Sequence, residues 1–508
     1  MSEPKGRGAS WTEERGTSDE GRTRSEGGTG RWVGARRRAN KITVIGGGLA
    51  GITAAVALAE SGADVTLLEA RPRLGGATCS FNRDGLIVDT GQHVFLGCCH
   101  AYRGLLAKLG MTEHAPLQDR FDVTVLAPGP VGQPKRARLR RTALPGPLHM
   151  LPALGRYPFL SRAERVRVSR PALAMRRVDP ADPAADTQRF GDWLAARGQS
   201  ERARRALWDL FSVSALNIAG DDASLALAAT VVKTGLLGKN NAADIGVPAL
   251  PLGELHGDAA ATLLAKLGAQ VTLGAKVSAV EPDQAGGFLV RLAGGDVTAD
   301  AVVLAVPHEK AAPLVPPGAL PAATVRAWAG LGASPIVNVH VAYDRPVTDL
   351  PFAAAIDSPV QWVFDRTRIS GLDQLSPGQQ YLAISLSAAD SYAEVPAARL
   401  REQFVPALAE LFPAAREAQV TEFFVTRERR ATFRQVPGSG ALRPKAATQQ
   451  PGLVLAGAWT DTGWPDTMEG AVRSGLAAAV ELRRTVLAQA GPGSGEPNAS
   501  ASTIGVRQ

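Results

Sequence analysis

Three glycines and one acidic residue near the start of the chain have the types and the spacing that bind a dinucleotide. The pattern Gly46-x-Gly48-x-x-Gly51 directly follows the β-branched run 41–45, and Glu69 stands about 20 residues further on. In such a loop the first glycine permits a tight turn, the second lets a pyrophosphate approach the backbone, and the third lets helix and strand pack closely. An acid in the place of Glu69 accepts hydrogen bonds from the ribose hydroxyls.

The elements around the glycines would place them correctly. The run 41–45 is typical of a buried parallel strand, 49–60 of an alanine-rich helix and 64–68 of a second strand. The free N–H groups and the positive dipole end of the helix then face the phosphates. The apolar run 42–59 is long enough to imitate a membrane span, but its spaced glycines and the lack of a cleavage-site pattern favour strand, turn and helix. We therefore predict that this loop binds a nucleotide, and we prefer this to the alternative of a glycine-rich turn that binds no ligand.

The residues after the second strand extend the pattern. Glu69-Ala-Arg-Pro-Arg-Leu-Gly75-Gly76 leads from the acid to a second glycine pair. This run resembles the extended fingerprint of the amine oxidase and carotenoid desaturase superfamily of flavoproteins, which implies FAD as the cofactor. That superfamily usually has arginine after the glycine pair, where this chain has Ala77. We expect Arg71 or Arg73 to make any phosphate contact instead, the alternative for both being a solvated turn.

A segment near the end of the chain resembles the second flavin motif of the same superfamily. A strand, Gly452-Leu-Val-Leu-Ala-Gly457, enters a glycine turn, and Asp461, Met468, Gly470 and Gly475 follow. The resemblance implies that Asp461 bonds the ribityl or phosphate region. It also implies that the backbone N–H of Met468, at a helix start, faces the flavin pyrimidine oxygen, where negative charge develops on reduction.

Two strands in the middle of the chain complete the predicted fold. Residues 271–277 are typical of a strand and a turn, and 300–307 of a buried strand. The resemblance implies that the backbone of Val277 lies against the adenine and that the second strand returns to the nucleotide domain. We therefore expect an α/β fold in which a discontinuous Rossmann-type FAD-binding domain, built from 41–130, 250–310 and 445–490, alternates with an α+β substrate domain built from 131–249 and 311–444. The polar, glycine-rich ends, 1–40 and 491–508, are expected to be disordered or flexible.

The predicted cofactor contacts come from all of these segments. The residues expected to bind FAD are Gly46, Gly48, Leu49, Ala50, Gly51, Glu69, Ala70, Arg71, Gly75, Gly76, Val277, Gly457, Asp461 and Met468.

Four further segments narrow the resemblance. Asp89-Thr-Gly-Gln-His-Val-Phe-Leu-Gly97, Ser334-Pro-Ile-Val-Asn-Val-His340, Ser358-Pro-Val-Gln-Trp-Val-Phe-Asp365 and Trp459-Thr-Asp-Thr-Gly-Trp-Pro465 together look like the hydroxysqualene dehydroxylase family. The similarity covers roughly residues 41–485. It implies reduction of hydroxysqualene to squalene and water in hopanoid synthesis, with reduced FAD as the hydride source. The alternatives are another FAD-dependent isoprenoid desaturase or amine oxidase, and a nucleotide-binding protein without catalysis.

Such a reaction needs an acid, a cation-tolerant environment and a hydride donor. His93 is a candidate proton donor, with a structural histidine as the alternative, and Asp365 is a second candidate acid. Aromatic side chains could line an apolar substrate tunnel and stabilise a cation, and plain core packing is the alternative for each. The candidates are Trp362, Phe364, Trp459 and Trp464.

Composition limits the partners. The formal charge is +8, yet no nucleic-acid module is present, and we predict no metal site. Three cysteines are too few for a disulfide framework and favour a reducing, cytoplasmic compartment. The apolar run 144–154 precedes a series of arginines, which favours peripheral contact with the inner face of the cell membrane over a solvated basic face. An external electron donor is implied, and the sequence does not identify it.

Overall fold

A parallel five-stranded sheet carries the glycine loop. In the computed structural model, which describes residues 40–130, 133–284 and 286–487, the sheet order is β9 (Gln270–Leu273), β2 (Asp64–Glu69), β1 (Lys41–Ile45), β13 (Ala301–Leu304) and β19 (Leu453–Leu455). The strands run parallel in register throughout. Strand order reverses between β1 and β13, and ligands of such sheets bind beyond the carboxyl ends of the strands at this switch point. The loop after β1 begins there.

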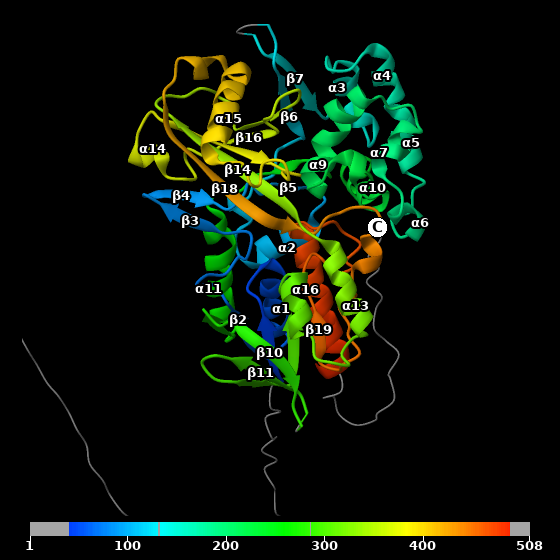
Figure 1. Ribbon diagram of the computed structural model, residues 1–508, viewed down its shortest axis with the longest axis vertical. Helices are drawn as coiled ribbons and strands as arrows, with labels where there is room; N and C mark the ends of the chain where they lie inside the picture. Colours follow the sequence, from blue (N-terminus) through cyan, green and yellow to red (C-terminus); the bar gives the residue numbers. More distant parts are fainter. Residues whose placement is uncertain (1–39, 131–132, 285, 488–508) are drawn as a thin grey trace, which may run out of the picture. The chain divides into compact units, whose positions relative to one another are not determined.

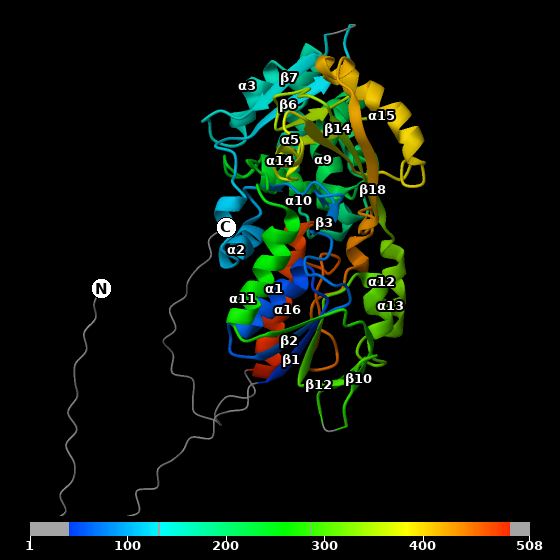
Figure 2. The same cartoon turned by 90° about the vertical axis from the view of Figure 1, so that its left-hand side faces the viewer.

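Helices cover one face of this sheet and a small antiparallel sheet covers the other (Figure 1). α1 (Leu49–Ala59) packs between α16 (Met468–Leu482) and α11 (Ala259–Lys266), and the three lie side by side in Figure 2. The small sheet consists of β10 (Val277–Pro282), β11 (Phe288–Leu292) and β12 (Val297–Ala299). The predicted α/β, amine oxidase-like fold is confirmed by this architecture and by the fold comparisons given below.

A second, seven-stranded sheet lies beyond the first. Its order is β18 (Val420–Thr432), β14 (Ser334–Tyr343), β17 (Gln380–Leu386), β16 (Trp362–Asp365), β15 (Phe352–Ala355), β6 (Asp122–Ala127) and β7 (Lys135–Arg140). One face packs against α15 (Ala397–Leu411) through aliphatic side chains of alternate strand positions. β6 corrects one predicted boundary: it falls within the range 41–130 assigned to the FAD-binding domain, yet its backbone pairs with β15 and β7. The division into two domains otherwise stays a prediction.

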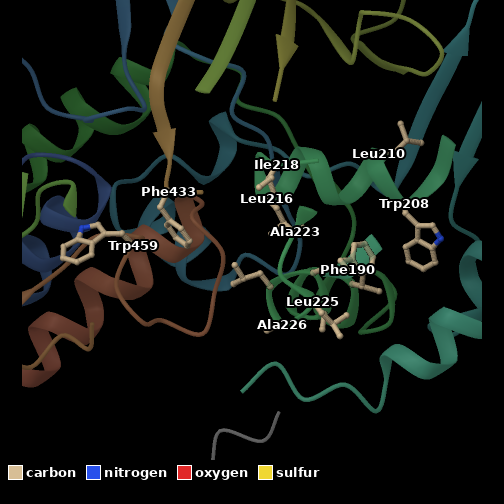
Figure 3. Close-up of a cluster of buried hydrophobic side chains, with 14 of the residues drawn as sticks. Phe190, Trp208, Leu210, Leu216, Ile218, Ala223, Leu225, Ala226, Phe433 and Trp459 are labelled. Carbon is tan, nitrogen blue, oxygen red and sulfur yellow. The ribbon is translucent and has the colours of Figure 1, made fainter. Parts of the chain in front are cut away.

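Short helices between residues 148 and 237 pack against the other face of the second sheet. One continuous hydrophobic cluster joins them to Phe433 and Trp459 (Figure 3). These helices are α3 (Leu151–Gly155), α4 (Arg162–Arg167), α5 (Ser169–Met175), α6 (Pro183–Asp186), α7 (Phe190–Ala195), α8 (Glu201–Ala203), α9 (Asp209–Leu216) and α10 (Leu225–Val231).

The remaining elements connect these layers. They are the hairpin β3 (Ser80–Arg83) and β4 (Leu86–Asp89), the pair β5 (Phe95–Leu96) and β8 (Ile245–Gly246), α2 (His100–Lys108), α12 (His308–Ala311), α13 (Ala322–Ala327) and α14 (Leu372–Leu375). None of the helices in the described ranges is both long and apolar enough to cross a membrane. The predicted tails, 1–40 and 491–508, lie outside the described residues except for Asn40.

Glu469 holds the start of α16 against the start of α2. Its carboxylate is buried and accepts hydrogen bonds from the backbone N–H groups of Ala101 (3.2 Å) and Tyr102 (2.8 Å). It also pairs with Arg473, one turn further along α16, at 2.7 Å. The carboxylate therefore satisfies donors at the N-terminus of α2 that would otherwise be buried without an acceptor.

We expect the substitution Glu469→Leu to lower the free energy of unfolding by roughly 2–4 kcal/mol, because it leaves two backbone donors and Arg473 without their partner. Urea unfolding monitored by circular dichroism measures this change. Glu481→Gln, on the same helix, is the matched control, because among the described residues the Glu481 carboxylate pairs only with the exposed Arg484 and such pairs contribute at most about 1 kcal/mol. Equal midpoints for the two variants would contradict this role of Glu469.

Candidate functional site

The glycine loop after β1 leaves the start of α1 open to a ligand. Gly46 has φ +109°, and a Cβ at Gly51 would overlap the carbonyl oxygen of Gly46, so the turn and the close helix packing both require glycine. Gly48 is the N-cap of α1, with no side-chain cap and no acidic residue in the first turn. The N–H groups of Leu49 and Ala50 therefore stand at an uncapped helix N-terminus, which is an anion-binding arrangement.

The second glycine pair lies directly against this loop. Gly75 donates its N–H to the carbonyl oxygen of Gly47 at 2.9 Å, and a Cβ at Gly76 would come within 2.8 Å of the Gly48 Cα. Close by in the chain, the Nη1 atom of Arg73 is buried without a hydrogen-bond partner among the described residues. A buried cationic donor without an acceptor fits a bound phosphate.

Arg71 and Ala70 have other surroundings. Arg71 is exposed and its Nη1 donates to the carbonyl oxygen of Gly76 at 3.3 Å, so it supports the glycine pair. Ala70 is exposed at the end of β2. Of the two arginines expected near the phosphates, Arg73 has the surroundings that suit such a contact.

The Glu69 side chain forms hydrogen bonds with the backbone of the glycine loop. Its buried carboxylate accepts from the backbone N–H groups of Gly47 (2.6 Å) and Arg71 (2.8 Å). Each oxygen keeps a further lone pair for a ribose hydroxyl. The Glu69 carbonyl oxygen accepts from Ala275 N–H at 2.8 Å, which brings the start of β10 at Val277 to the same end of β2.

The C-terminal motif is organised by Arg443, which the sequence motifs did not indicate. This buried guanidinium donates to the carbonyl oxygens of Ala458, Thr460 and Trp464 at 2.6–3.0 Å. Burial lowers its pKa. Asp461, predicted to bond the cofactor, is exposed, and its carboxylate makes no hydrogen bond within the described residues. The backbone carbonyls around it, rather than its own side chain, fix the loop.

Gly457 lies just after β19 and Met468 lies at the start of α16. Gly457 follows β19 and donates its N–H to Ser474 Oγ at 2.8 Å. Met468 begins α16, whose N-cap Thr467 accepts from Gly470 N–H at 3.3 Å. α16 packs on α1 so tightly that a Cβ at Gly475 would overlap the Ala50 carbonyl oxygen. The two helices that carry the motifs are therefore in direct backbone contact.

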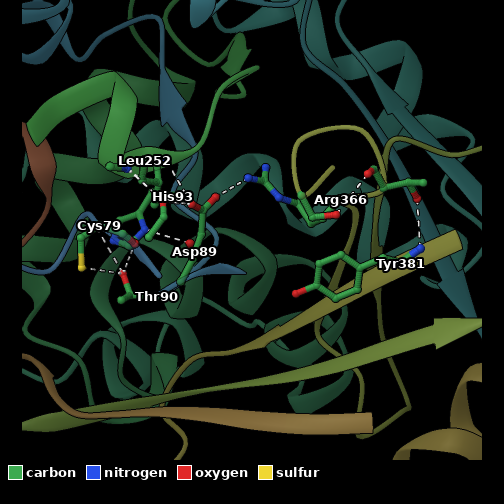
Figure 4. Close-up of polar contacts among 12 residues, drawn as sticks. Cys79, Asp89, Thr90, His93, Leu252, Arg366 and Tyr381 are labelled. Carbon is green, nitrogen blue, oxygen red and sulfur yellow. Dashed lines mark hydrogen bonds and ion pairs between the residues drawn. The ribbon is translucent and has the colours of Figure 1, made fainter. Parts of the chain in front are cut away.

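A buried ion pair ties the hairpin β3–β4 to the second sheet (Figure 4). Asp89, at the end of β4, pairs with Arg366, and both side chains are almost fully buried. The Asp89 carboxylate also accepts from Ser80 Oγ (2.6 Å) and from Leu252 N–H (3.0 Å). The loop that follows Asp89 is thus fixed at the junction of the two sheets.

The loop 90–93 carries polar atoms without partners next to the glycine pair. Thr90 donates its hydroxyl to the carbonyl oxygen of Ala77, which directly follows Gly76, at 2.6 Å, and its own carbonyl oxygen accepts from Asn338 Nδ2 at 3.2 Å. Asn338 is fully buried, and its Oδ1 has no partner among the described residues, as is also true of Gln92 Oε1. Asn338 belongs to the motif Ser334–His340, but the sequence does not single it out. Only the structure shows that its buried Oδ1 lacks a hydrogen-bond partner among the described residues.

His93 lies in the same cluster. Its Nδ1 is 3.1 Å from the carbonyl oxygen of Gly91, and a Cβ at Gly91 would come within 3.1 Å of the imidazole and 3.8 Å of Asn338 Nδ2. Burial lowers the pKa of His93 from 6.5, against a smaller raising effect of the nearby Asp89. At neutral pH the ring is therefore mostly neutral. If Nδ1 carries the proton that Gly91 accepts, Nε2 is free to bind a proton.

Asp365 faces away from this cluster. Its carboxylate accepts from the backbone and the hydroxyl of Thr367 at 2.9 and 2.5 Å, and from Gln380 Nε2 at 2.8 Å. Strand alternation puts it, with Val363, on the face of β16 that packs towards α15. The three hydrogen bonds make the Asp365 carboxylate hold the strand end, so the geometry favours a structural role over that of a catalytic acid.

Trp362 and Phe364 lie on the opposite face of β16, the same face as Asn338. Cross-strand pairing aligns Trp362 with Ser385, which in turn pairs with Asn338. The two aromatic rings stack at 6.3 Å, and Trp362 Nε1 donates to Ser214 Oγ on α9 at 2.8 Å. These side chains form an aromatic wall beside the polar cluster, in which Trp362 is half-buried and Phe364 is buried, and a place beside a substrate stays a prediction for both.

Trp459 and Trp464 differ from that pair. The Trp459 indole is buried, donates to the carbonyl oxygen of Val306 at 2.9 Å and packs edge-on against Trp328 at 4.8 Å. Its contacts favour the core-packing alternative over contact with a substrate. Trp464 is half-buried with the Arg473 guanidinium 4.5 Å above its ring, so a cation already covers one face.

Comparison with known proteins identifies the class. A model of flavin-containing amine oxidoreductases matches residues 49–483, and one of pyridine nucleotide-disulphide oxidoreductases matches residues 13–84. Since the first match spans most of the chain, this protein belongs to the flavin-containing amine oxidoreductase family. Its cofactor is FAD, and the uncapped α1 start and the unpartnered Arg73 fit that group.

Particular relatives confirm the resemblance seen in the motifs. Hydroxysqualene dehydroxylase of Rhodopseudomonas palustris is 31% identical over 86% of this chain and 97% of its own length. Zeta-carotene desaturase of Zea mays is 26% identical over 86% of this chain and 82% of its length. Putrescine oxidase in complex with putrescine has a TM-score of 0.65 at 20% identity, covering 88% of this chain and 99% of that one, which shows a shared fold.

We expect Gly51→Ala to weaken flavin binding by roughly tenfold or more, equivalent to about 1.4 kcal/mol. The reason is that the new Cβ meets the Gly46 carbonyl oxygen and must displace the loop. The measurement is the flavin content of purified protein and its titration with FAD. Gly104→Ala is the control, because Gly104 lies in α2 with open space around it. Full flavin content in both variants would count against the loop as the binding element.

Proposed function

We propose that this protein reduces hydroxysqualene to squalene, with loss of water. The carbon that carries the allylic hydroxyl gains a hydride, and the leaving oxygen gains a proton, so that the C–O bond breaks and water forms. FAD, when bound in its reduced form, supplies the hydride. The observation that carries the proposal is the 31% identity to a hydroxysqualene dehydroxylase over 97% of that enzyme's length.

The polar cluster beside the glycine pair suits the hydroxyl end of such a substrate. Asn338 Oδ1 is a buried acceptor without a partner in the described part of the chain, so it can accept a hydrogen bond from an alcohol. His93, like Asn338, lies within 4 Å of the position that a Cβ of Gly91 would take, and it can hold the proton that departs with the hydroxyl. In the proposal Asn338 orients the hydroxyl and His93 is the acid.

The aromatic wall suits the rest of the substrate. Loss of an allylic hydroxyl leaves positive charge on carbon, and the faces of Trp362 and Phe364 stabilise a nearby cation. The half-buried Trp362, stacked on Phe364, also offers an apolar surface to a long hydrocarbon chain. The proposed partners are thus an apolar isoprenoid substrate and an external electron donor that restores the reduced cofactor.

Anaerobic turnover tests the proposal directly. Holoenzyme with chemically reduced flavin is mixed with hydroxysqualene, and products are separated by gas chromatography with mass detection. We expect squalene in an amount equal to the flavin oxidised. The 26% identity to a carotene desaturase defines the competing outcome. If squalene does not form, and oxidised enzyme instead desaturates a carotene with a quinone acceptor, the proposal is wrong.

The acid role of His93 predicts a pH dependence. Because burial lowers its pKa below 6.5, the cation is the minor form at pH 7, and its population grows as the pH falls. We therefore expect kcat/KM for hydroxysqualene to rise as the pH is lowered from 8 to about 6, and His93→Gln to reduce the rate by roughly 100-fold and flatten this rise.

The exposed His100, at the start of α2, provides the control. His100→Gln should keep both the rate and the shape of the profile. A profile in the His93→Gln variant that still rises towards low pH would assign the proton to another group.

A further inference from the structure

The helices α4 and α5 form one amphipathic unit with a mixed outer face. Val168, between them, has helical backbone angles, and Ala172 N–H bonds the Val168 carbonyl oxygen, so the helical path continues. The buried side chains Val168, Pro171 and Met175 recur at intervals of three and four residues and face the core. The outer face must therefore lie on the opposite side.

That outer face alternates arginine with aliphatic side chains. Val166 is 74% exposed and Leu173 is 60% exposed. Arg162 and Arg170 lie four residues to either side of Val166, and Arg177 lies four residues after Leu173. A face that only needed solvation would not keep two aliphatic side chains so exposed, since burial of each such side chain is worth roughly 1.5–3 kcal/mol.

A neighbouring segment extends the exposed apolar surface. The segment 144–155, whose helix α3 contacts α4, exposes Leu144 (46%), Leu148 (46%) and Leu151 (50%). Together with Val166 and Leu173, these make five of the eleven large hydrophobic side chains that are exposed in the described residues. We call the surface formed by residues 144–177 the arginine–leucine face.

Its positive charge is not neutralised. Residues 144–177 contain seven arginines and one acid, Glu164. The Glu164 carboxylate is occupied by Ser161 and Ser200 at 2.8 and 2.5 Å. Within the described parts of the chain, Arg162, Arg170 and Arg177 take part in no ion pair, whereas many other exposed arginines do, Arg399 and Arg429 among them. The face therefore lacks an anionic partner of its own.

We propose that the arginine–leucine face docks on the surface of a bilayer that contains anionic lipids. An anionic headgroup layer accepts the unpaired guanidinium groups, and the acyl boundary just below it accepts the exposed leucines and valine. A nucleic acid would satisfy the charges but leave the aliphatic side chains in water. This docking goes beyond the proposed function and does not depend on it.

The inner side chains of α4 and α5 connect the proposed docking surface with the substrate region. Val168 and Met175 belong to the hydrophobic cluster that also contains Phe364 and contacts Trp362. The arginine–leucine face is thus the outer surface of helices that share one hydrophobic cluster with the aromatic wall. An apolar substrate that is dissolved in the bilayer would have to leave it close to this layer.

Vesicle cosedimentation of the full-length holoprotein tests the proposal. We expect binding to vesicles that contain phosphatidylglycerol, little binding to vesicles of phosphatidylcholine alone, and loss of binding as salt is added. Arg170→Gln and Arg177→Gln should each lower the partition coefficient about fivefold. Leu173→Asp should lower it at least as much, because it removes an inserted side chain and adds a repelled charge.

Matched variants elsewhere provide the controls. Arg326→Gln removes an exposed arginine of α13 that has no ion pair in the described residues, and Val480→Asp changes a 61% exposed side chain of α16. Both should bind vesicles as the unchanged protein does. Flavin content and the thermal midpoint of every variant report on folding, which surface changes alter little.

Three results would overturn the proposal. They are equal binding to both kinds of vesicle, unchanged binding in the three variants of the face, and binding to DNA that the same variants abolish in place of vesicle binding. Turnover of detergent-dispersed hydroxysqualene separates this proposal from the proposed function. Vesicle binding without turnover supports docking alone, and turnover without vesicle binding supports the reaction alone.

Discussion

The buried ion pair between Asp89 and Arg366 is the interaction on which the site depends. Asp89 ends β4 of the hairpin β3–β4, and Arg366 directly follows β16 of the second sheet. Because both charges are withdrawn from water, neither can separate without a large cost, so the junction of the two sheets has one arrangement. Thr90, Gln92 and His93 follow Asp89 directly and inherit that fixed position.

The glycines serve the same end by a different means. Gly75 and Gly76 bring one backbone segment against Gly48, and Gly475 brings α16 against α1. At Gly76 and Gly475 a Cβ would meet the facing backbone at 2.8 and 2.3 Å, so any side chain would force the two segments apart. Close backbone approach at these points brings several N–H groups and helix N-termini towards one ligand. Bulkier residues at the same positions would keep these backbone groups further apart.

The parallel sheet and its ligand loops were predictable because their signals are local. The strands at 41–45 and 64–69 and the helix from Leu49 follow from periodicity, and the glycines follow from spacing. Non-local features were beyond the sequence. β6 joins the second sheet through pairing with a strand more than 200 residues away. Arg443 is important because it donates to backbone carbonyl oxygens of the C-terminal motif, and Asn338 because its buried Oδ1 lacks a partner among the described residues. Asp365 and Trp459 belong to recognisable motifs and were candidates for the site. In the structure their side chains form hydrogen bonds with Gln380 and with the Val306 carbonyl oxygen.

The position of β19 and α16 in the chain has a consequence for biosynthesis. These elements, residues 453–482, supply the last strand of the parallel sheet and the helix that packs on α1. A nascent chain that ends before them has the glycine loop but an open sheet edge at β13, and lacks Glu469 at the start of α2. The nucleotide-binding half therefore stays incomplete until residues 453–482 have left the ribosome, and FAD can be enclosed only after that point.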